Sequence, residues 1–321
     1  MKDLSNVVSI LVDAEGGDQR IDNFLMRYCK GVPRSHIYRI LRTGEVRVNS
    51  RRVDATYRVQ PGDSVRVPPI RIAQRTEGGT RKATALELPV IHEDDALIAV
   101  DKPAGIAVHG GSGIAFGVIE RLRAARPDAR FLELVHRLDR ETSGLLLIAK
   151  KRSALKVLHE AMREGHVAKR YLALVHGVFA NDKRRVNAPL RKYLMQGGER
   201  RVSVDAEEGK ESATVFRRQK TFADCTLLSA ELETGRTHQI RVHLVHIGHP
   251  IAGDDKYGDF AWNKEIAKKG LKRMFLHAAE LDVEHPLTGI MLKLRAPLPP
   301  ELSGYLEKLQ PSGKKPEKRP A

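Results

Sequence analysis

The stretch that most constrains the fold is residues 134–150, where a charged cluster lies between two apolar runs. The second run, residues 144–149, is short and continuous, which predicts a strand buried on both faces. Asp139 then falls on a loop at the edge of a buried sheet, beside Arg137 and Arg140. A partly desolvated carboxylate among arginines suits a nucleophile or a base, whereas this stretch alone also allows a surface loop of mixed charge.

Composition narrows the classes of partner. The chain has 321 residues and a formal net charge of +16, so its partner is expected to be a polyanion, with nucleic acid ahead of an anionic membrane surface. Its two cysteines lie far apart with no CxxC motif, which argues against a disulfide framework and suits a reducing cytoplasm. No apolar run approaches membrane-spanning length, and the N-terminus does not have the pattern of a signal peptide.

The N-terminal region predicts a small basic module. Apolar residues from position 20 recur at helical spacing, Gly31 stops the first helix, and Pro33 suits the first turn of a second. Short strands are expected near residues 46–48 and 63–67, joined through a tight Pro-Gly-Asp turn at residues 61–63. The arginines expected to contact nucleic acid in this module are Arg34, Arg39, Arg42, Arg47, Arg51 and Arg52.

This module resembles an S4 domain, the small RNA-binding unit of a ribosomal protein and of several RNA-modifying enzymes. The residues that carry the resemblance include Arg34-Ser35, the run GEVRVN at 44–49 and the Pro-Gly-Asp turn. We expect an N-terminal arm or edge strand at residues 1–19, the S4 domain at 20–69 and a flexible linker at 70–87. A second domain is expected at 88–308, and the basic tail at 309–321 is expected to be disordered.

Several elements of the second domain can be placed before any resemblance is used. Residues 96–100 and 169–175 predict strands, residues 153–163 predict a helix that ends at Gly165, and residues 213–233 predict two longer strands. A glycine-rich loop follows His109 and could present backbone N–H groups to a phosphate, although a plain tight turn fits equally well.

A further motif, TGRTHQIRVH, occupies residues 234–243. It predicts a helix capped by Thr237, with Arg236 adding its charge to the positive helix end. His238 and His243 are five residues apart and lack an accompanying carboxylate cluster, so the spacing argues against a metal site.

Taken together, these pieces resemble the RluA-type pseudouridine synthases over residues 88–308. The matching motifs are DKPAG at 101–105, HRLDRETSG at 136–144, KRY at 169–171, TGRTHQIRVH, and FLHA at 275–278. The resemblance implies an α+β fold with a central mixed, largely antiparallel sheet flanked by helices and loops. An S4 domain in front is typical of members that modify large-subunit (23S) ribosomal RNA, and VHGGSG at 108–113 is most similar to their C-type subgroup.

The resemblance also implies a chemistry, the exchange of a uracil N1–C1′ bond for a C5–C1′ bond. Asp139 would be the catalytic carboxylate, acting either by addition to C1′ or by promoting a glycal. Arg236 would be its ion-pair partner, and Tyr171 would lie against the uracil and assist loss of the C5 proton. Arg137 would fill the gap left by the flipped nucleotide. His109, Arg140 and Arg241 complete the expected RNA contacts.

The reaction needs no redox step, so neither a cofactor nor a metal is expected. The expected partner is 23S ribosomal RNA, the expected location is the cytoplasm, away from membranes, and the expected state is a monomer. Two alternatives stay open at this point: the same enzyme acting on transfer RNA, and a non-catalytic RNA-binding protein that keeps the fold. The intact Asp139, Tyr171 and Arg236 argue against the second alternative.

Overall fold

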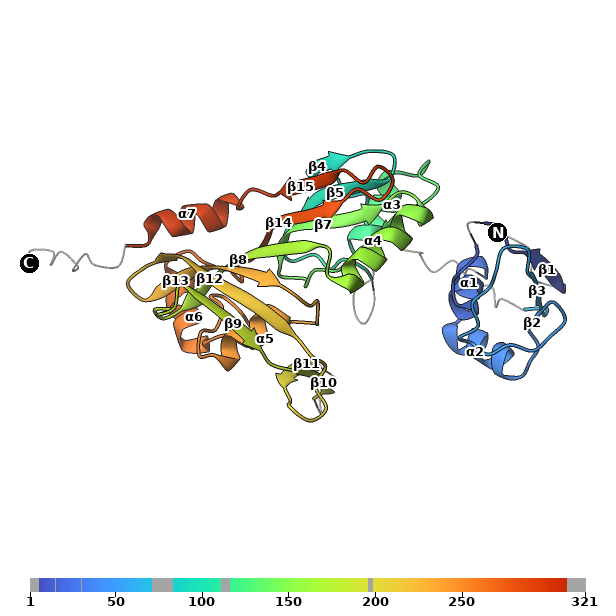
Figure 1. The fold of residues 1–321 in the computed structure, drawn as a ribbon, viewed down its shortest axis with the longest axis horizontal. Helices are drawn as coiled ribbons and strands as arrows, with labels where there is room; N and C mark the ends of the chain where they lie inside the picture. The colour runs from blue at the N-terminus through green and yellow to red at the C-terminus, as the bar shows by residue number, and fades with distance from the viewer. Residues whose placement is uncertain are drawn as a thin grey trace, which may run out of the picture. The chain divides into compact units, whose positions relative to one another are not determined.

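The computed structural model describes residues 6–14, 16–29, 31–70, 83–110, 116–195 and 199–310. The chain divides into two compact units, residues 1–82 and 83–321, each described here by itself (Figure 1). Most of the predicted linker, the glycine-rich loop beyond Gly110 and nearly all of the basic tail lie outside the described residues. No helix within the described ranges is long and apolar enough to cross a membrane.

The first unit is a two-helix, three-strand module. Its elements are β1 (Val8–Leu11), α1 (Ile21–Tyr28), α2 (Arg34–Arg42), β2 (Arg47–Val48) and β3 (Ser64–Val67). The strand order is β1-β3-β2, and both pairings are antiparallel. Ile21, Leu25, Ile37 and Ile40 are fully buried in one core, as their helical spacing predicts. The segment before residue 20 supplies an edge strand to this sheet.

The second unit is built on one ten-stranded sheet. Its strands are β4 (Val90–Glu93), β5 (Leu97–Lys102), β6 (Glu133–Leu134), β7 (Ser143–Ala149), β8 (Ala168–His176), β9 (Lys183–Asn187), β12 (Ala213–Thr221), β13 (Cys225–Leu232), β14 (Leu276–Glu284) and β15 (Met291–Arg295). A separate hairpin is formed by β10 (Leu190–Leu194) and β11 (Arg200–Val204). The main path runs β4-β5-β7-β14-β8-β13-β12-β9, and only the β7–β14 pairing along it is parallel.

Helices cover both faces of this sheet. They are α3 (Val118–Ala125), α4 (Arg152–Glu164), α5 (Gln239–His246), α6 (Phe260–Lys268) and α7 (Pro300–Lys308). Every residue of β7 is buried: Leu146 and Ile148 pack in the core that contains residues of α3 and α5, whereas Leu145 and Leu147 pack in the core that contains Leu158 of α4. A strand covered on both sides must be apolar throughout, which is why its sequence shows no alternation.

One cross-strand row brings distant motifs together. Lys102 on β5 pairs with Gly144 on β7, Gly144 with Ala278 on β14, Ala278 with Tyr171 on β8, and Tyr171 with Ala230 on β13. The row requires glycine at its second position, because Gly144 has a φ of +108° and a Cβ there would lie 2.3 Å from the carbonyl oxygen of Ala278. The loop that carries Asp139 therefore enters the sheet two strands from β8, which carries Tyr171, with β14 between them.

Candidate active site

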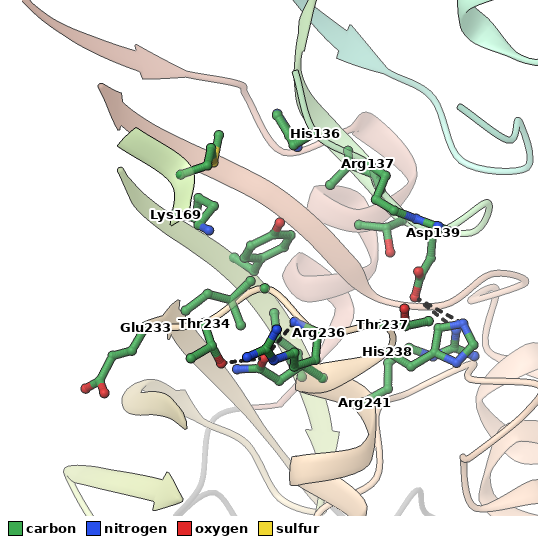
Figure 2. Close-up of a pocket in the computed structure, with 18 of the residues that line it drawn as sticks. His136, Arg137, Asp139, Lys169, Glu233, Thr234, Arg236, Thr237, His238 and Arg241 are labelled. Carbon is green, nitrogen blue, oxygen red and sulfur yellow. Dashed lines mark hydrogen bonds and ion pairs between the residues drawn. The ribbon is translucent and has the colours of Figure 1, made fainter. Parts of the chain in front are cut away.

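The motifs predicted to carry the chemistry surround one pocket of about 590 Å³. Its lining includes Asp139 from the loop before β7, Tyr171 from β8, and Arg236, His238 and Arg241 from the start of α5 (Figure 2). These residues lie as many as 102 positions apart in the chain and meet because β7, β14 and β8 are adjacent in the sheet.

Arg241 is the cation that contacts Asp139. Its Nη1 donates to Oδ2 of Asp139 at 3.2 Å, and its Nε and Nη2 donate to both carboxylate oxygens of Asp254 at 2.7 Å. The guanidinium also lies 5.0 Å from the ring centre of Tyr257. Only 5% of the Arg241 side chain is exposed, so this fork of hydrogen bonds is fixed within the protein.

Burial and pairing oppose each other at this arginine. Burial works against the charged forms of Arg241 and Asp254, but their mutual hydrogen bonds and attraction outweigh it. As a result the pKa of Arg241 is raised and that of Asp254 is lowered. Asp254 therefore supports a permanent positive charge next to Asp139.

The sequence-based choice of Arg236 as the ion-pair partner is wrong. The Nε of Arg236 donates to the backbone carbonyl of Glu211 at 3.1 Å, and Figure 2 shows its side chain away from the Asp139 carboxylate. The reason is the helix start, because α5 begins at Gln239 and not directly after Thr237. Arg241 therefore occupies the first helical turn and points inward. It had been expected only as an RNA contact, and its burial makes it part of the protein interior.

The side chain of Gln239 holds the residues before α5. Its Oε1 accepts from the Thr234 hydroxyl at 2.7 Å and from the Arg236 backbone N–H at 2.9 Å, while its Nε2 donates to Ala213 and Thr214 on β12. This bonding attaches the loop at residues 234–238 to the sheet. It thereby fixes where α5 begins.

Tyr171 is 8% exposed and faces the pocket from β8. Burial, with the negative charge of Asp139 adding to it, raises the pKa of the Tyr171 phenol. The hydroxyl is therefore protonated at neutral pH. Its ring is available to pack against a planar ligand, and its hydroxyl can relay a proton.

The remaining predicted residues of this unit separate into two groups. Arg137 is exposed and lines the pocket, together with Lys169. His109 and Arg140 are not among the described residues that line it. Arg140 forms an exposed ion pair with Glu141 at 2.7 Å, so its side chain is directed to the surface.

A buried lysine, Lys102 of the DKPAG motif, supports the Asp139 loop. Lys102 is fully buried, and its Nζ donates to the backbone carbonyls of Pro103, Ile106 and Arg140 at 2.7, 2.9 and 3.2 Å. Burial, reinforced by the nearby charge of Arg273, lowers the pKa of Lys102 to about 8. Because Arg140 follows Asp139 directly, Lys102 fixes the backbone next to the carboxylate. The sequence signal that could have identified this role is a lysine at the end of an otherwise largely apolar strand.

All six arginines predicted as nucleic-acid contacts in the first unit are exposed: Arg34, Arg39, Arg42, Arg47, Arg51 and Arg52. Arg39 is partly neutralised by Glu45, at 3.1 Å. The histidines do not assemble a metal site, since the described residues contain no cluster of three or more metal-binding side chains. His243 is instead buried and bonded to Ser212, Thr214 and the carbonyl of Ala188.

Comparison with known proteins agrees with this geometry. The model of the family described as RNA pseudouridylate synthase matches residues 96–246, and the S4 domain model matches residues 19–65. The chain is 53% identical over 310 residues to ribosomal large subunit pseudouridine synthase C of Salmonella typhi, covering 95% of this chain and 96% of that one. It is 52% identical, with the same coverage, to the protein of the same name in Escherichia coli K12.

Solved structures show the same fold. Human RNA pseudouridylate synthase domain containing 1 superposes with a TM-score of 0.58 at 24% identity, covering 70% of this chain and 89% of that one. Human RNA pseudouridylate synthase domain containing 4 gives 0.57 at 25% identity, covering 69% and 94%. The predicted α+β fold class, with its mixed and largely antiparallel sheet behind an S4 domain, is confirmed.

Proposed function

Because the chain belongs to the RNA pseudouridylate synthase family, we propose that it isomerises specific uridines in the 23S RNA of the large ribosomal subunit to pseudouridine. The observation that carries the proposal is Asp139, held by buried Arg241 in a pocket that Tyr171 also lines. The names of the relatives support ribosomal RNA over transfer RNA as the substrate.

The reaction requires a carboxylate at the junction of sugar and base. The N1–C1′ bond breaks, the uracil turns within the pocket, a C5–C1′ bond forms, and the hydrogen lost from C5 is balanced by one gained at N1. Among the described residues, the Asp139 carboxylate accepts from Arg241 at 3.2 Å and lies 3.8 Å from Nε2 of His238, in both cases through Oδ2. Oδ1 is therefore the oxygen offered to the substrate, whether it adds to C1′ or acts at the sugar to promote a glycal.

Tyr171 and Arg137 would handle the base. The buried phenol ring of Tyr171 would pack on the uracil, and its protonated hydroxyl would relay the C5 proton instead of acting as a standing phenolate. Exposed Arg137, two residues before Asp139, would occupy the gap left by the extruded nucleotide. Extrusion costs a few kcal/mol and less for unpaired bases, so we expect targets in loops.

The S4 domain would anchor the RNA through its exposed arginines, which contact phosphate without reading sequence. We further propose that the protein acts as a monomer in the cytoplasm. It would use no cofactor, because the isomerisation involves no net oxidation or reduction.

The direct test is pseudouridine mapping by carbodiimide and primer extension on ribosomal RNA from a strain lacking the gene. Complementation with the parent should restore the missing stops, whereas Asp139→Asn should not. In vitro, Asp139→Asn should abolish tritium release from uridine labelled at C5 and leave RNA affinity within a few-fold, since one carboxylate contributes little to binding a polyanion. Unchanged RNA in the deletion strain would exclude this substrate, and residual turnover by Asp139→Asn would exclude Asp139 as the reacting group.

A further inference from the structure

His238 has a backbone conformation that needs an explanation. Its φ is 54°, and within the described part of the second unit it is the one residue other than glycine in the left-handed region. This conformation costs free energy for any residue other than glycine, although histidine and asparagine adopt it more readily than most, and surrounding contacts must stabilise it. His238 stands at the N-cap of α5 and makes no side-chain cap hydrogen bond, so capping does not account for it.

The contacts of the ring supply the reason. Nδ1 of His238 lies 2.8 Å from the hydroxyl of Tyr257, and the two rings meet edge to face with centroids 5.5 Å apart. On its other side, Nε2 lies 3.8 Å from Oδ2 of Asp139 (Figure 2). The left-handed turn thus places the imidazole between Tyr257 and the catalytic carboxylate.

The tautomer follows from the hydrogen bonds of Tyr257. Its oxygen accepts from the backbone N–H of Val202 on β11 at 2.9 Å, and its own proton needs an acceptor. Among the described residues, Nδ1 of His238 is the acceptor within reach. Nδ1 is then unprotonated, and the ring hydrogen resides on Nε2, which faces Asp139.

Two series of side-chain contacts therefore lead from the loop that contains Asp254 and Tyr257 to Oδ2 of Asp139. Asp254 acts through Arg241, and Tyr257, three residues later, acts through His238. This loop also contacts the β10–β11 hairpin, because Arg201 donates to the carbonyl of Lys256 at 3.2 Å.

We propose that His238 is a positioning residue that donates its Nε2 hydrogen to Oδ2 of Asp139 when RNA is bound, and that Tyr257 holds it in the donating tautomer. The separation of 3.8 Å exceeds an ordinary N–H···O distance of about 2.9 Å by roughly 0.9 Å, a gap that catalytic hydrogen bonds commonly close on substrate binding. With Arg241 and His238 both on Oδ2, the carboxylate cannot rotate, and Oδ1 stays directed at the sugar. This inference rests on the proposed isomerase function.

The test compares two substitutions at position 238 that separate hydrogen bonding from backbone fit. His238→Asn tolerates the left-handed backbone and can still reach Tyr257, but it is too short to reach Asp139. His238→Gln fits that backbone less well but places an amide donor near the position of Nε2. A merely structural role predicts that Asn is the better replacement, whereas donation to Asp139 predicts that Gln is.

Single-turnover rates at saturating RNA are the readout. His238→Asn should be slower by roughly 10- to 100-fold, the size expected for one hydrogen bond to a charged group, with RNA affinity within twofold. His238→Gln should recover several-fold of that loss. Tyr257→Phe keeps the ring beneath Arg241 and should lower the rate by roughly 5- to 10-fold. Adding this substitution to His238→Asn should cause little further loss of rate, because Tyr257 acts on Asp139 through His238. Tyr193→Phe on exposed β10 is the matched control and should be neutral.

The outcomes are distinguishable. An Asn variant within twofold of the parent rate, a Gln variant slower than Asn, or losses that multiply in the double variant would each overturn the proposal. Weaker RNA binding at an unchanged saturated rate would make His238 an RNA contact instead. If thermal melting shows that a position-238 variant does not fold, the single-turnover rate of Tyr257→Phe compared with that of Tyr193→Phe still tests the proposal. A parent without turnover would refute the isomerase function itself.

Discussion

Arg241→Met should lower both the stability and the turnover of the protein, because Arg241 holds two carboxylates at once, those of Asp139 and Asp254. Arg241 neutralises Asp254, whose side chain is 1% exposed, and it also holds Asp139. Removing one partner of a buried pair leaves an uncompensated charge and costs about 3–5 kcal/mol. In a domain of this size each kcal/mol shifts the melting temperature by about 2–4 °C, so we expect a fall of roughly 6–20 °C. Turnover should fall by roughly 10- to 100-fold or more, because Asp139 loses a charged hydrogen bond.

A second substitution separates the two effects. Arg241→Met combined with Asp254→Asn removes the orphan charge but keeps an oxygen that accepts from the backbone N–H groups of Lys256 and Tyr257, so it should recover much of the lost stability. Activity should stay low, since Asp139 still lacks its cation. Arg236→Met is the matched control, because it removes a guanidinium from the same pocket. Among the described residues, the Nε of Arg236 donates to the backbone carbonyl of Glu211 and to no carboxylate, so the melting temperature of this variant should change little.

The pH dependence of stability tests whether the unpaired charge of Asp254 causes the loss of stability in Arg241→Met. In the parent, the lowered pKa of Asp254 contributes stability above its unfolded pKa, and that stability is lost as the pH falls through the folded value. In Arg241→Met, burial is opposed only by the backbone N–H groups of Lys256 and Tyr257, so the pKa of Asp254 should rise and the folded state should take up a proton more readily than in the parent. The deficit relative to the parent should therefore shrink between about pH 7 and pH 4. A deficit independent of pH, or a double variant no more stable than Arg241→Met, would refute this reasoning.

Three further outcomes follow from the structure. In urea unfolding, Gly144→Ala should lower the free energy of unfolding by about 1–3 kcal/mol more than Gly165→Ala does. Both glycines have a positive φ, but of the two only Gly144 has no room for a Cβ, which would collide with the carbonyl of Ala278. Burial lowers the pKa of His277 to about 4, below the unfolded value near 6.5, so the unfolded state is protonated first; stability should fall as the pH drops through this window, and less steeply in His277→Gln. Removing residues 1–82 should leave a folded domain that modifies a short hairpin, with the salt slope of RNA binding reduced by about 0.9 for each lost phosphate contact.

The sequence by itself indicated much of the local structure and the residue proposed as the reacting group. The unbroken apolar run at residues 144–149 required a strand covered on both faces, and the spacing of Ile21 and Leu25 required a helix, because periodicity is set by the backbone geometry of each element. Asp139 and Tyr171 could be singled out because their motifs are specific. The helices α6 and α7 and the strand β15 were not anticipated, since they carry no motif.

The tertiary structure alone decided which side chains meet. Arg236 and Arg241 stand in one motif and carry the same charge, and the choice between them depends on where α5 begins. Contacts with β12, which precedes α5 in the chain, and with Tyr257, which follows it, fix that start. The burial of Lys102 against the carbonyl of Arg140 likewise depends on β5 and β7 being neighbours. Periodicity is a local property of the chain, whereas an ion pair depends on the relative placement of elements, which only the assembled sheet defines.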